Sequence, residues 1–226
     1  MVVFITTLLK IAGGNSTVLV SGCPEKMKDR LSKKYLEKVE QVGFVSEIGG
    51  VPRLNMMGGE LCVNATLAFA SQLFDKGELV TSGVEGKIKY ENKNGVTKIS
   101  IPLKYRKLKN IILFDGIGFI CIDKCRKFRL TKKFLSNFCK RYDLLAFGAI
   151  IYDQNRIDPY VYVKEVNSFV RETACGSGSI AYSLFSGYGE IVQPTKKVIE
   201  VKRVSDKNIE VISKVCEIKE GLINDS

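Results

Sequence analysis

The sequence predicts an α+β protein made of two similar halves. Each half runs through strands, a helix, more strands, a glycine-flanked cysteine, an apolar helix and strands again. The 226 residues exceed the roughly 150 that are usual for one domain, so they fit one large domain or two small lobes. Apolar residues make up 45% and charged residues 26% of the chain, which excludes a disordered chain or a rod.

The first half alternates short apolar runs with turns rich in glycine and asparagine. This pattern predicts strands at 1–10, 17–20, 42–48, 51–57 and several within 79–103. Apolar residues at helical spacing predict two helices. The first runs from Pro24 to about Val39, and the second, with a broad apolar face, runs from Val63 to Phe74.

The second half repeats this order after a weak boundary around 102–108. Helices are predicted at 131–142 and 179–186, the second of them apolar. A polar stretch predicts a loop at 153–158, and only the tail at 224–226 reads as frayed. Strands are predicted at 111–122, 144–152, 159–166, 189–193, 197–203 and 208–217.

The composition excludes several classes of protein. There is no histidine, which rules out a histidine base, a Ser-His-Asp triad and a histidine-ligated metal. The seven cysteines are an odd number without a C-x-x-C pair, so neither a disulfide framework nor a metal site is expected. No apolar run reaches the ~18 residues that span a bilayer and no targeting segment is recognisable, so we expect a cytoplasmic protein without a membrane partner.

The charge balance is strongly basic. Lysine and arginine number 35 against 24 aspartates and glutamates, a formal net charge of +11, with basic clusters at 104–109 and 124–133. No RNA-binding motif, zinc finger or helix-turn-helix pattern accompanies these clusters, so we expect no nucleic-acid partner. The positive field would instead attract anionic small molecules.

Two segments carry the candidate chemistry: 58–68 with Cys62, and 172–181 with Cys175. Each places a cysteine at a glycine-flanked corner just before an apolar helix. Free amides at a helix start carry partial positive charge, so we expect them to lower the thiol pKa and to bind carboxylate or phosphate. Taken singly, either cysteine could be a small buried residue, and the second corner could be a phosphate cradle.

If the two lobes face each other, the two cysteines would flank one small molecule. A thiolate on one side could remove the Cα proton of an amino acid, while a thiol on the other side returns a proton to the opposite face. Oriented amides would hold the carboxylate and stabilise the developing carbanion. The pattern therefore predicts inversion of an amino acid at Cα.

Beyond these features, the chain resembles the diaminopimelate epimerase family of cofactor-independent, two-cysteine amino-acid racemases and epimerases. The matching stretches follow the family's order over nearly the whole chain: Gly14-Asn15, Glu40 to Phe44, Glu60 to Thr66, Glu172 to Gly178 and Gln193-Pro194. The likeness is greatest to its histidine racemases of metallophore synthesis. It implies a diaminopimelate epimerase-like α+β fold of two pseudo-symmetric lobes, 1–104 and 105–210, each a curled β-sheet around a central helix with the active site in the cleft between them. The segment 211–226 would return to the first lobe.

By position, the resemblance implies that Cys62 and Cys175 are the catalytic base and acid. It implies substrate-binding roles for Asn15, Glu40, Asn64, Glu172, Gly176, Ser177 and Gly178. Residues 176–178 would hold the α-carboxylate, and the glutamates would set thiol protonation or contact the substrate. From the residues alone, Asn15 could equally be a turn residue, the glutamates could be solvated, and Ser177 could be a helix cap. The resemblance implies no cofactor.

The chain departs from the family at several positions. Val63 replaces the usual glycine after the first cysteine, and Phe119 stands where many relatives carry histidine. Valine adds bulk beside the carboxylate site, which would weaken binding or narrow the substrate range. L-Histidine is the lead substrate. Diaminopimelate epimerase, an isomerase like the phenazine-pathway branch and a non-catalytic binding protein stay open as alternatives, as does a homodimer.

Overall fold

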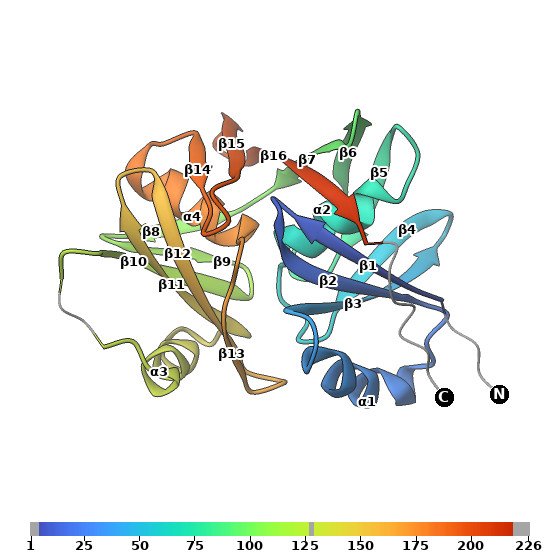
Figure 1. Cartoon of the computed structure of the whole chain (residues 1–226), viewed down its shortest axis with the longest axis horizontal. Coiled ribbons are helices and arrows are strands. Elements are labelled where there is room, and N and C mark those ends of the chain that lie inside the picture. Colours follow the sequence, from blue (N-terminus) through green and yellow to red (C-terminus); the bar gives the residue numbers. More distant parts are fainter. Residues whose placement is uncertain (1–4, 127–128, 219–226) are drawn as a thin grey trace.

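The computed structural model describes residues 5–126 and 129–218 (Figure 1). Its helices are α1 (Glu25–Leu36), α2 (Val63–Ser71), α3 (Lys132–Tyr142) and α4 (Gly176–Ser186). The strands of the first half are β1 (Ile5–Ile11), β2 (Gly14–Ser21), β3 (Gln41–Ile48), β4 (Val51–Met56), β5 (Lys76–Thr81), β6 (Ile88–Lys93) and β7 (Val96–Pro102). The remaining strands are β8 (Tyr105–Leu108), β9 (Ile111–Phe114), β10 (Ile117–Asp123), β11 (Ala146–Asp153), β12 (Arg156–Val163), β13 (Ser168–Arg171), β14 (Glu190–Val192), β15 (Val198–Ser205) and β16 (Asn208–Glu217).

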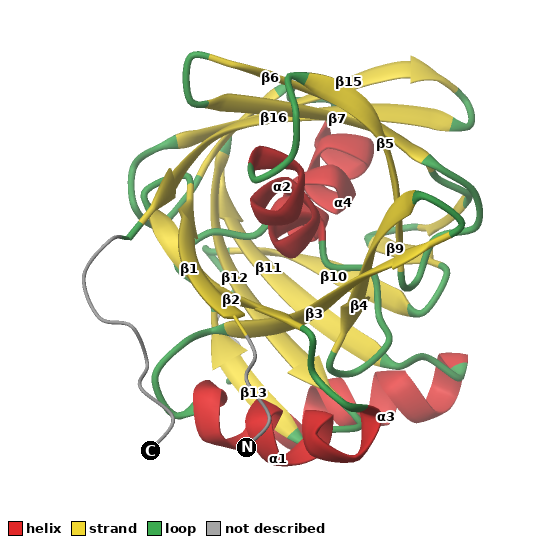
Figure 2. Cartoon of the chain, turned by 90° about the vertical axis from the view of Figure 1, so that its right-hand side faces the viewer, coloured by secondary structure: helices red, strands yellow, loops and turns green. Residues whose placement is uncertain are grey.

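The first seven strands and β16 form a closed ring. The order is β1-β2-β3-β4-β5-β6-β7-β16, and a pairing of β16 with β1 closes it. Two pairs are parallel, β2 with β3 and β4 with β5, and the helices α1 and α2 provide their crossovers. Figure 2 shows α2 enclosed by the strands, whereas α1 lies outside them.

The second half repeats this pairing plan around α4. The order continues from β16 through β15, β14, β12, β11, β10 and β9 to the edge strand β8. Again two pairs are parallel, β10 with β11 across α3 and β12 with β14 across α4. The helix α4 contacts the inner face of this curled sheet, and α3 packs on its outer face (Figure 1). The chain therefore has the sheet-rich α+β architecture with a repeated plan that the sequence predicts in outline.

The composition of each helix explains its place. Every residue from Val63 to Ala70 in α2 and from Gly176 to Tyr182 in α4 is buried. A helix surrounded by a sheet has to be apolar on all sides, because no face reaches water. The outer helices are amphipathic, with buried residues on one side only, such as Leu31 in α1 and Leu135 in α3. No helix in the described ranges is both long and apolar enough to cross a bilayer.

Several predicted boundaries are wrong. Helix α2 ends at Ser71 instead of Phe74, whose side chain is 88% exposed. The predicted loop at 153–158 is a tight turn between β11 and β12, with Gln154 at a φ of 52°. The strands β8 and β13 were not expected, because their sequences are too polar for the alternating pattern. The prediction of β16 is confirmed residue for residue, whereas 1–4 and the tail 219–226 lie outside the described residues.

Candidate active site

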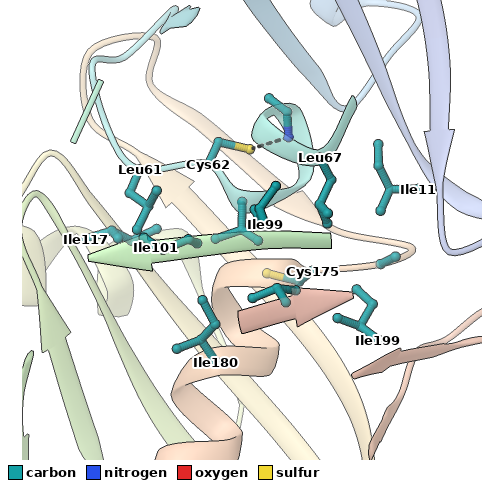
Figure 3. Close-up of a cluster of buried hydrophobic side chains, with 14 of the residues drawn as sticks. Ile11, Leu61, Cys62, Leu67, Ile99, Ile101, Ile117, Cys175, Ile180 and Ile199 are labelled. Carbon is teal, nitrogen blue, oxygen red and sulfur yellow. Dashed lines mark hydrogen bonds between the residues drawn. The ribbon is translucent and has the colours of Figure 1, made fainter. Parts of the chain in front are cut away.

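The two cysteines begin the two central helices. Cys62 is the N-cap of α2, and its Sγ accepts a hydrogen bond from the amide of Ala65 at 3.4 Å. Cys175 is the N-cap of α4 and accepts from the amide of Gly178 at 3.1 Å. Both side chains belong to the main buried cluster, and Figure 3 shows them at the starts of their helices. The structure thus brings together the two corners that the sequence singled out.

Hydrogen bonds join the starts of α2 and α4. Asn64 in α2 accepts from the amide of Gly176 at 2.8 Å, and Ser177 in α4 accepts from the amide of Val63 at 3.2 Å. The Asn64 side chain also donates to the carbonyl of Ala174 at 2.8 Å. Because these hydrogen bonds join the two helix starts, the two corners have one fixed relative position.

Val63 fits this junction because its neighbour is glycine. A Cβ on Gly176 would lie 2.5 Å from Cγ1 of Val63, which is closer than two carbon atoms can approach. The valine that departs from the family pattern is fully buried and fills the space over Gly176. Its bulk therefore packs between the two helix starts.

A narrow pocket of about 30 Å³ lies beside the cysteines, between the two halves. Its lining residues are Glu40, Gln41, Met57, Glu60, Leu61, Cys62, Asn64, Ile117, Phe119, Val161, Val163, Ser168, Val170, Glu172, Cys175 and Ser177. This volume has room for about two water molecules, so the pocket has to widen before an amino acid can enter. Three of these residues are glutamates, and the described lining contains neither lysine nor arginine. The pocket is therefore acidic, although the chain as a whole is basic.

Gln41 connects the first cysteine to Glu172. The Cys62 thiol donates to Oε1 of Gln41 at 3.0 Å, and Nε2 of Gln41 donates to Oε1 of Glu172 at 2.8 Å. The Thr17 hydroxyl lies 3.3 Å from Oε1 of Gln41 and 3.1 Å from Oδ1 of Asn15, and it can donate to either oxygen. Glu172 in turn lies beside the Cys175 thiol. One polar chain therefore runs from Cys62 to Cys175.

Burial raises the pKa of both thiols, contrary to the sequence expectation. The pKa of Cys62 lies well above the ordinary value of 9.0, because of burial first and the Glu172 carboxylate second. Burial and Glu172 raise the pKa of Cys175 in the same way. The amides of Ala65 and Gly178 act in the expected direction, but they are outweighed. Both cysteines are therefore thiols until a base takes a proton.

Two buried carboxyls can act as such a base. Burial raises the pKa of Glu60 to about 7 and that of Glu172 to about 7. One oxygen of each, Oε2, has no hydrogen-bond partner among the described residues. Glu60 was missed by the sequence analysis as a site residue, although it lies within a stretch that carries the family resemblance, and so was Gln41.

Glu40 and Asn15 form hydrogen bonds that link the segments around the pocket. Glu40 accepts from the amide and the hydroxyl of Thr173, at 3.0 and 2.6 Å, and from Nδ2 of Asn15 at 3.3 Å. Glu40 lines the pocket, whereas Asn15 is fully buried and is absent from the described lining. Both therefore tie β2 and β3 to the segment that precedes α4.

Some of the other predicted site residues line the pocket, and the rest lie behind its lining. Asn64, Glu172 and Ser177 line the pocket. Gly176 and Gly178 lie in the first turn of α4, with their amides bonded to Asn64 and to Cys175. Among the described residues, no cluster of three or more acidic or cysteine side chains has the spacing that holds a metal ion. Phe119 is buried and contributes an apolar wall to the pocket.

Comparison with known proteins gives a consistent set of relatives. Residues 10–219 match the family described as the histidine racemase CntK N-terminal domain. Two histidine racemases from strains of Fusobacterium nucleatum subsp. nucleatum are 33% and 32% identical over 212 residues, covering 76% of this chain and 77% of each relative.

Solved structures share the fold at low identity. A predicted epimerase from Pseudomonas aeruginosa has a TM-score of 0.67 at 7% identity, with 94% of this chain and 96% of that chain covered. A phenazine biosynthesis protein of the PhzF family from Enterococcus faecalis has a TM-score of 0.58 at 14% identity, with 95% and 97% covered. These two likenesses concern the fold alone.

Proposed function

The chain belongs to the histidine racemase family, whose members are isomerases, and on that premise we propose that it inverts L-histidine at Cα without a cofactor, using Cys62 and Cys175. The observation that carries the proposal is the placement of the two thiols. Each heads one of the two central helices, and both line one pocket. Such a pair can act on opposite faces of one carbon atom, as inversion requires.

The hydrogen-bonded path from Cys62 to Cys175 suggests which cysteine is protonated when the reaction begins. Cys62 donates to Gln41, so it is the thiol, whereas Glu172 lies beside Cys175 and would accept its proton. The Cys175 thiolate would then remove the Cα proton of one enantiomer. The electron pair would remain on Cα and the carboxylate, and Cys62 would deliver its proton to the opposite face. The reverse reaction uses the same groups with exchanged protonation.

Amides at the two helix starts would bind the α-carboxylate. Positive partial charge from α2 and α4 converges on the corner where Ser177 lines the pocket. Gly176, Ser177 and Gly178 would offer amides there, once the carboxylate replaces Asn64 and Cys175 as the acceptors for Gly176 and Gly178. This arrangement would also stabilise the charge that develops as the Cα proton leaves. Asn15 and Glu40 would hold the corner in place through Thr173.

The acidic pocket favours histidine over diaminopimelate. A second substrate carboxylate would meet Glu40, Glu60 and Glu172 without a lysine or arginine in the described lining. Like charges in a dry site repel strongly. An imidazole ring, neutral or protonated, carries no such penalty. The charge of the pocket thus supports the substrate that the relatives' names carry.

The division into lobes, the cellular location and the assembly of the enzyme are part of the same proposal. We divide the chain into lobes at 1–104 and 105–210, with 211–226 returning to the first lobe, because the pairing plan repeats and β16 joins both halves. We place the enzyme in the cytoplasm, where its D-histidine would serve a nicotianamine-like metallophore. A homodimer is compatible with it.

Proton exchange in heavy water tests the function directly. Reduced protein would be mixed with a panel of L-amino acids that includes histidine and diaminopimelate. NMR would follow the Cα proton, and chiral chromatography would follow the D-isomer. We expect exchange and D-isomer formation with histidine, lowered by roughly 100-fold or more in Cys62→Ser and in Cys175→Ser.

A third cysteine provides the matched control. Cys139 in α3 is as buried as the other two but lies in a separate core cluster. Cys139→Ser should keep its turnover. Normal turnover in either of the first two variants would exclude the two-thiol mechanism, and exchange with diaminopimelate alone would exclude histidine as the substrate.

A further inference from the structure

We propose that Glu60 determines the preference for histidine, by accepting a hydrogen bond from a ring N–H of the bound imidazole. The inference deepens the proposed function and rests on it for the identity of the substrate. Glu60 would be a specificity residue that touches the side chain of the substrate and takes no part in the proton transfer at Cα.

The first observation is an oxygen without a partner. Glu60 is 4% exposed, and its Oε2 has no hydrogen-bond partner among the described residues. Buried polar atoms in folded proteins are nearly always bonded, and the exceptions frequently belong to functional sites. Because Glu60 also lines the pocket, a donor on the substrate can supply the missing hydrogen bond.

The second observation is the space around that oxygen. A Cβ on Gly58 would lie 2.5 Å from Oε2 of Glu60 and 2.5 Å from Cγ1 of Val163. Glycine at position 58 therefore leaves room for the carboxylate in this orientation. The same contacts place the oxygen next to the apolar wall that β12 contributes.

The third observation is the shape and polarity of this part of the pocket. Ile117 and Phe119 from β10 and Val161 and Val163 from β12 line it with apolar surface. A flat ring fits apolar walls, and a single polar group among them fixes its orientation. Glu60 is a carboxylate on such a wall, so it selects a ring that carries an N–H donor.

The charges that face Glu60 are consistent with this role. The Glu60 charge raises the pKa of Cys62 and of Glu172, and the backbone amides of Gly58 and Glu60 lower the pKa of Glu60 itself. Burial nevertheless keeps that pKa at about 7, close to the ~6.5 of a free imidazole. Carboxyl and ring can therefore share one proton near neutral pH.

Equilibrium binding to two ligands of similar shape tests the inference. L-Histidine has a ring N–H, whereas 3-(2-thienyl)-L-alanine has a flat ring of similar size without one. Calorimetry would give the Kd of each ligand for the wild type, Glu60→Met and Glu60→Gln. We expect the wild type to prefer histidine by roughly tenfold or more, as for a hydrogen bond to a charged group.

The two variants separate the hydrogen bond from the charge. In Glu60→Met the Kd values of the two ligands should lie within about threefold of each other. Only the affinity for histidine should fall, because no acceptor remains for its ring N–H. Glu60→Gln keeps an acceptor oxygen and should recover part of the preference. Thr81→Val is the matched control. Thr81 is buried, its Oγ1 has no hydrogen-bond partner within the part of the chain that the structure describes, and it lies outside the described lining. The Thr81→Val variant should therefore prefer histidine as strongly as the wild type does.

Each outcome separates this inference from the racemase. A wild type without a preference for histidine, or a Glu60→Met variant that keeps it, would overturn the role of Glu60. The role of Glu60 would also be overturned if Glu60→Met lowered the affinity for both ligands equally in a protein that is still folded. Folding is judged by a thermal unfolding midpoint within about 2 °C of that of Glu60→Gln. A Glu60-dependent preference without any Cα exchange would support Glu60 and overturn the racemase.

Discussion

Gln41 and Glu172 lie 131 positions apart in the chain, and a hydrogen bond of 2.8 Å joins the amide of one to the carboxylate of the other. The same glutamine accepts from the Cys62 thiol, so one side chain contacts the acid–base machinery of both halves. Turning the amide by 180° would present Nε2 to a Cys62 thiolate and Oε1 to a protonated Glu172. The glutamine thus suits both protonation states that inversion requires.

We expect Gln41→Met to slow the reaction in both directions, by roughly tenfold, because neither protonation state keeps its hydrogen bonds. The measurement is the pH profile of kcat for L- and D-histidine, in which both limbs should move. Gln72→Met, at an exposed glutamine beyond α2, is the control and should match the wild type. An unchanged profile in Gln41→Met would remove the linking role of Gln41.

Stability should fall as the pH rises through neutrality. The carboxyls of Glu60 and Glu172 have pKa values of about 7 in the folded state against an ordinary 4.5, so the folded state binds their protons more tightly. Their contribution is complete below about pH 4.5 and is lost as the pH rises through about 7. It amounts to on the order of 3 kcal/mol for each carboxyl.

Urea denaturation between pH 5 and pH 8 tests whether the free energy of unfolding falls as the pH rises. Glu60→Gln should flatten the decline and should be more stable than the wild type at pH 8, since it removes a buried charge. The exposed Glu165→Gln should follow the wild-type curve. A Glu60→Gln curve that falls as steeply as the wild type would contradict the raised pKa.

Thiol alkylation should spare the two site cysteines at pH 7. Burial keeps Cys62 and Cys175 protonated, whereas Cys125 and Cys216 are exposed. Alkylating reagents attack the accessible thiolate, so we expect the exposed pair to react first and the site pair slowly. Peptide mass spectrometry after timed treatment with iodoacetamide gives the order. Fast modification of Cys62 in the free protein would show that the pocket opens readily.

Gly176→Ala should destabilise the protein through a steric clash with Val63. We expect a loss of about 1–3 kcal/mol, as for other overpacked cores. Val63→Ala removes the clashing methyl groups, so the double variant should lose less than the sum of the two single variants. Free energies of unfolding from urea titrations give the coupling. Additive losses would mean that the two positions do not touch.

The sequence predicted the overall plan and the two cysteine corners because both depend on local patterns. The all-apolar helices that follow Cys62 and Cys175 identify the central helices α2 and α4. The strand β16 was equally regular. The edge strand β8 and the strand β13 were missed. They are strands because their backbones pair with β9 and β12, and their own side chains show no strand pattern.

The sequence could not identify the partners of the buried polar groups. Gln41 and Glu60 lie in stretches that the family resemblance covers, but their roles depend on contacts with residues far away in the chain. The thiol pKa was predicted in the wrong direction for the same reason. Helix starts are visible in a sequence, whereas the burial that outweighs them arises only when the two halves meet.

The position of β16 has a consequence for how the protein is made. Its residues 208–212 lie between β15 and β7, and the end of the strand pairs with β1. A ribosome therefore has to release the residues up to about Glu217 before the first ring can close. Until then the buried residues of β7, such as Ile99 and Ile101, border an open strand edge. We expect nascent chains of this protein to need protection by chaperones until β16 emerges.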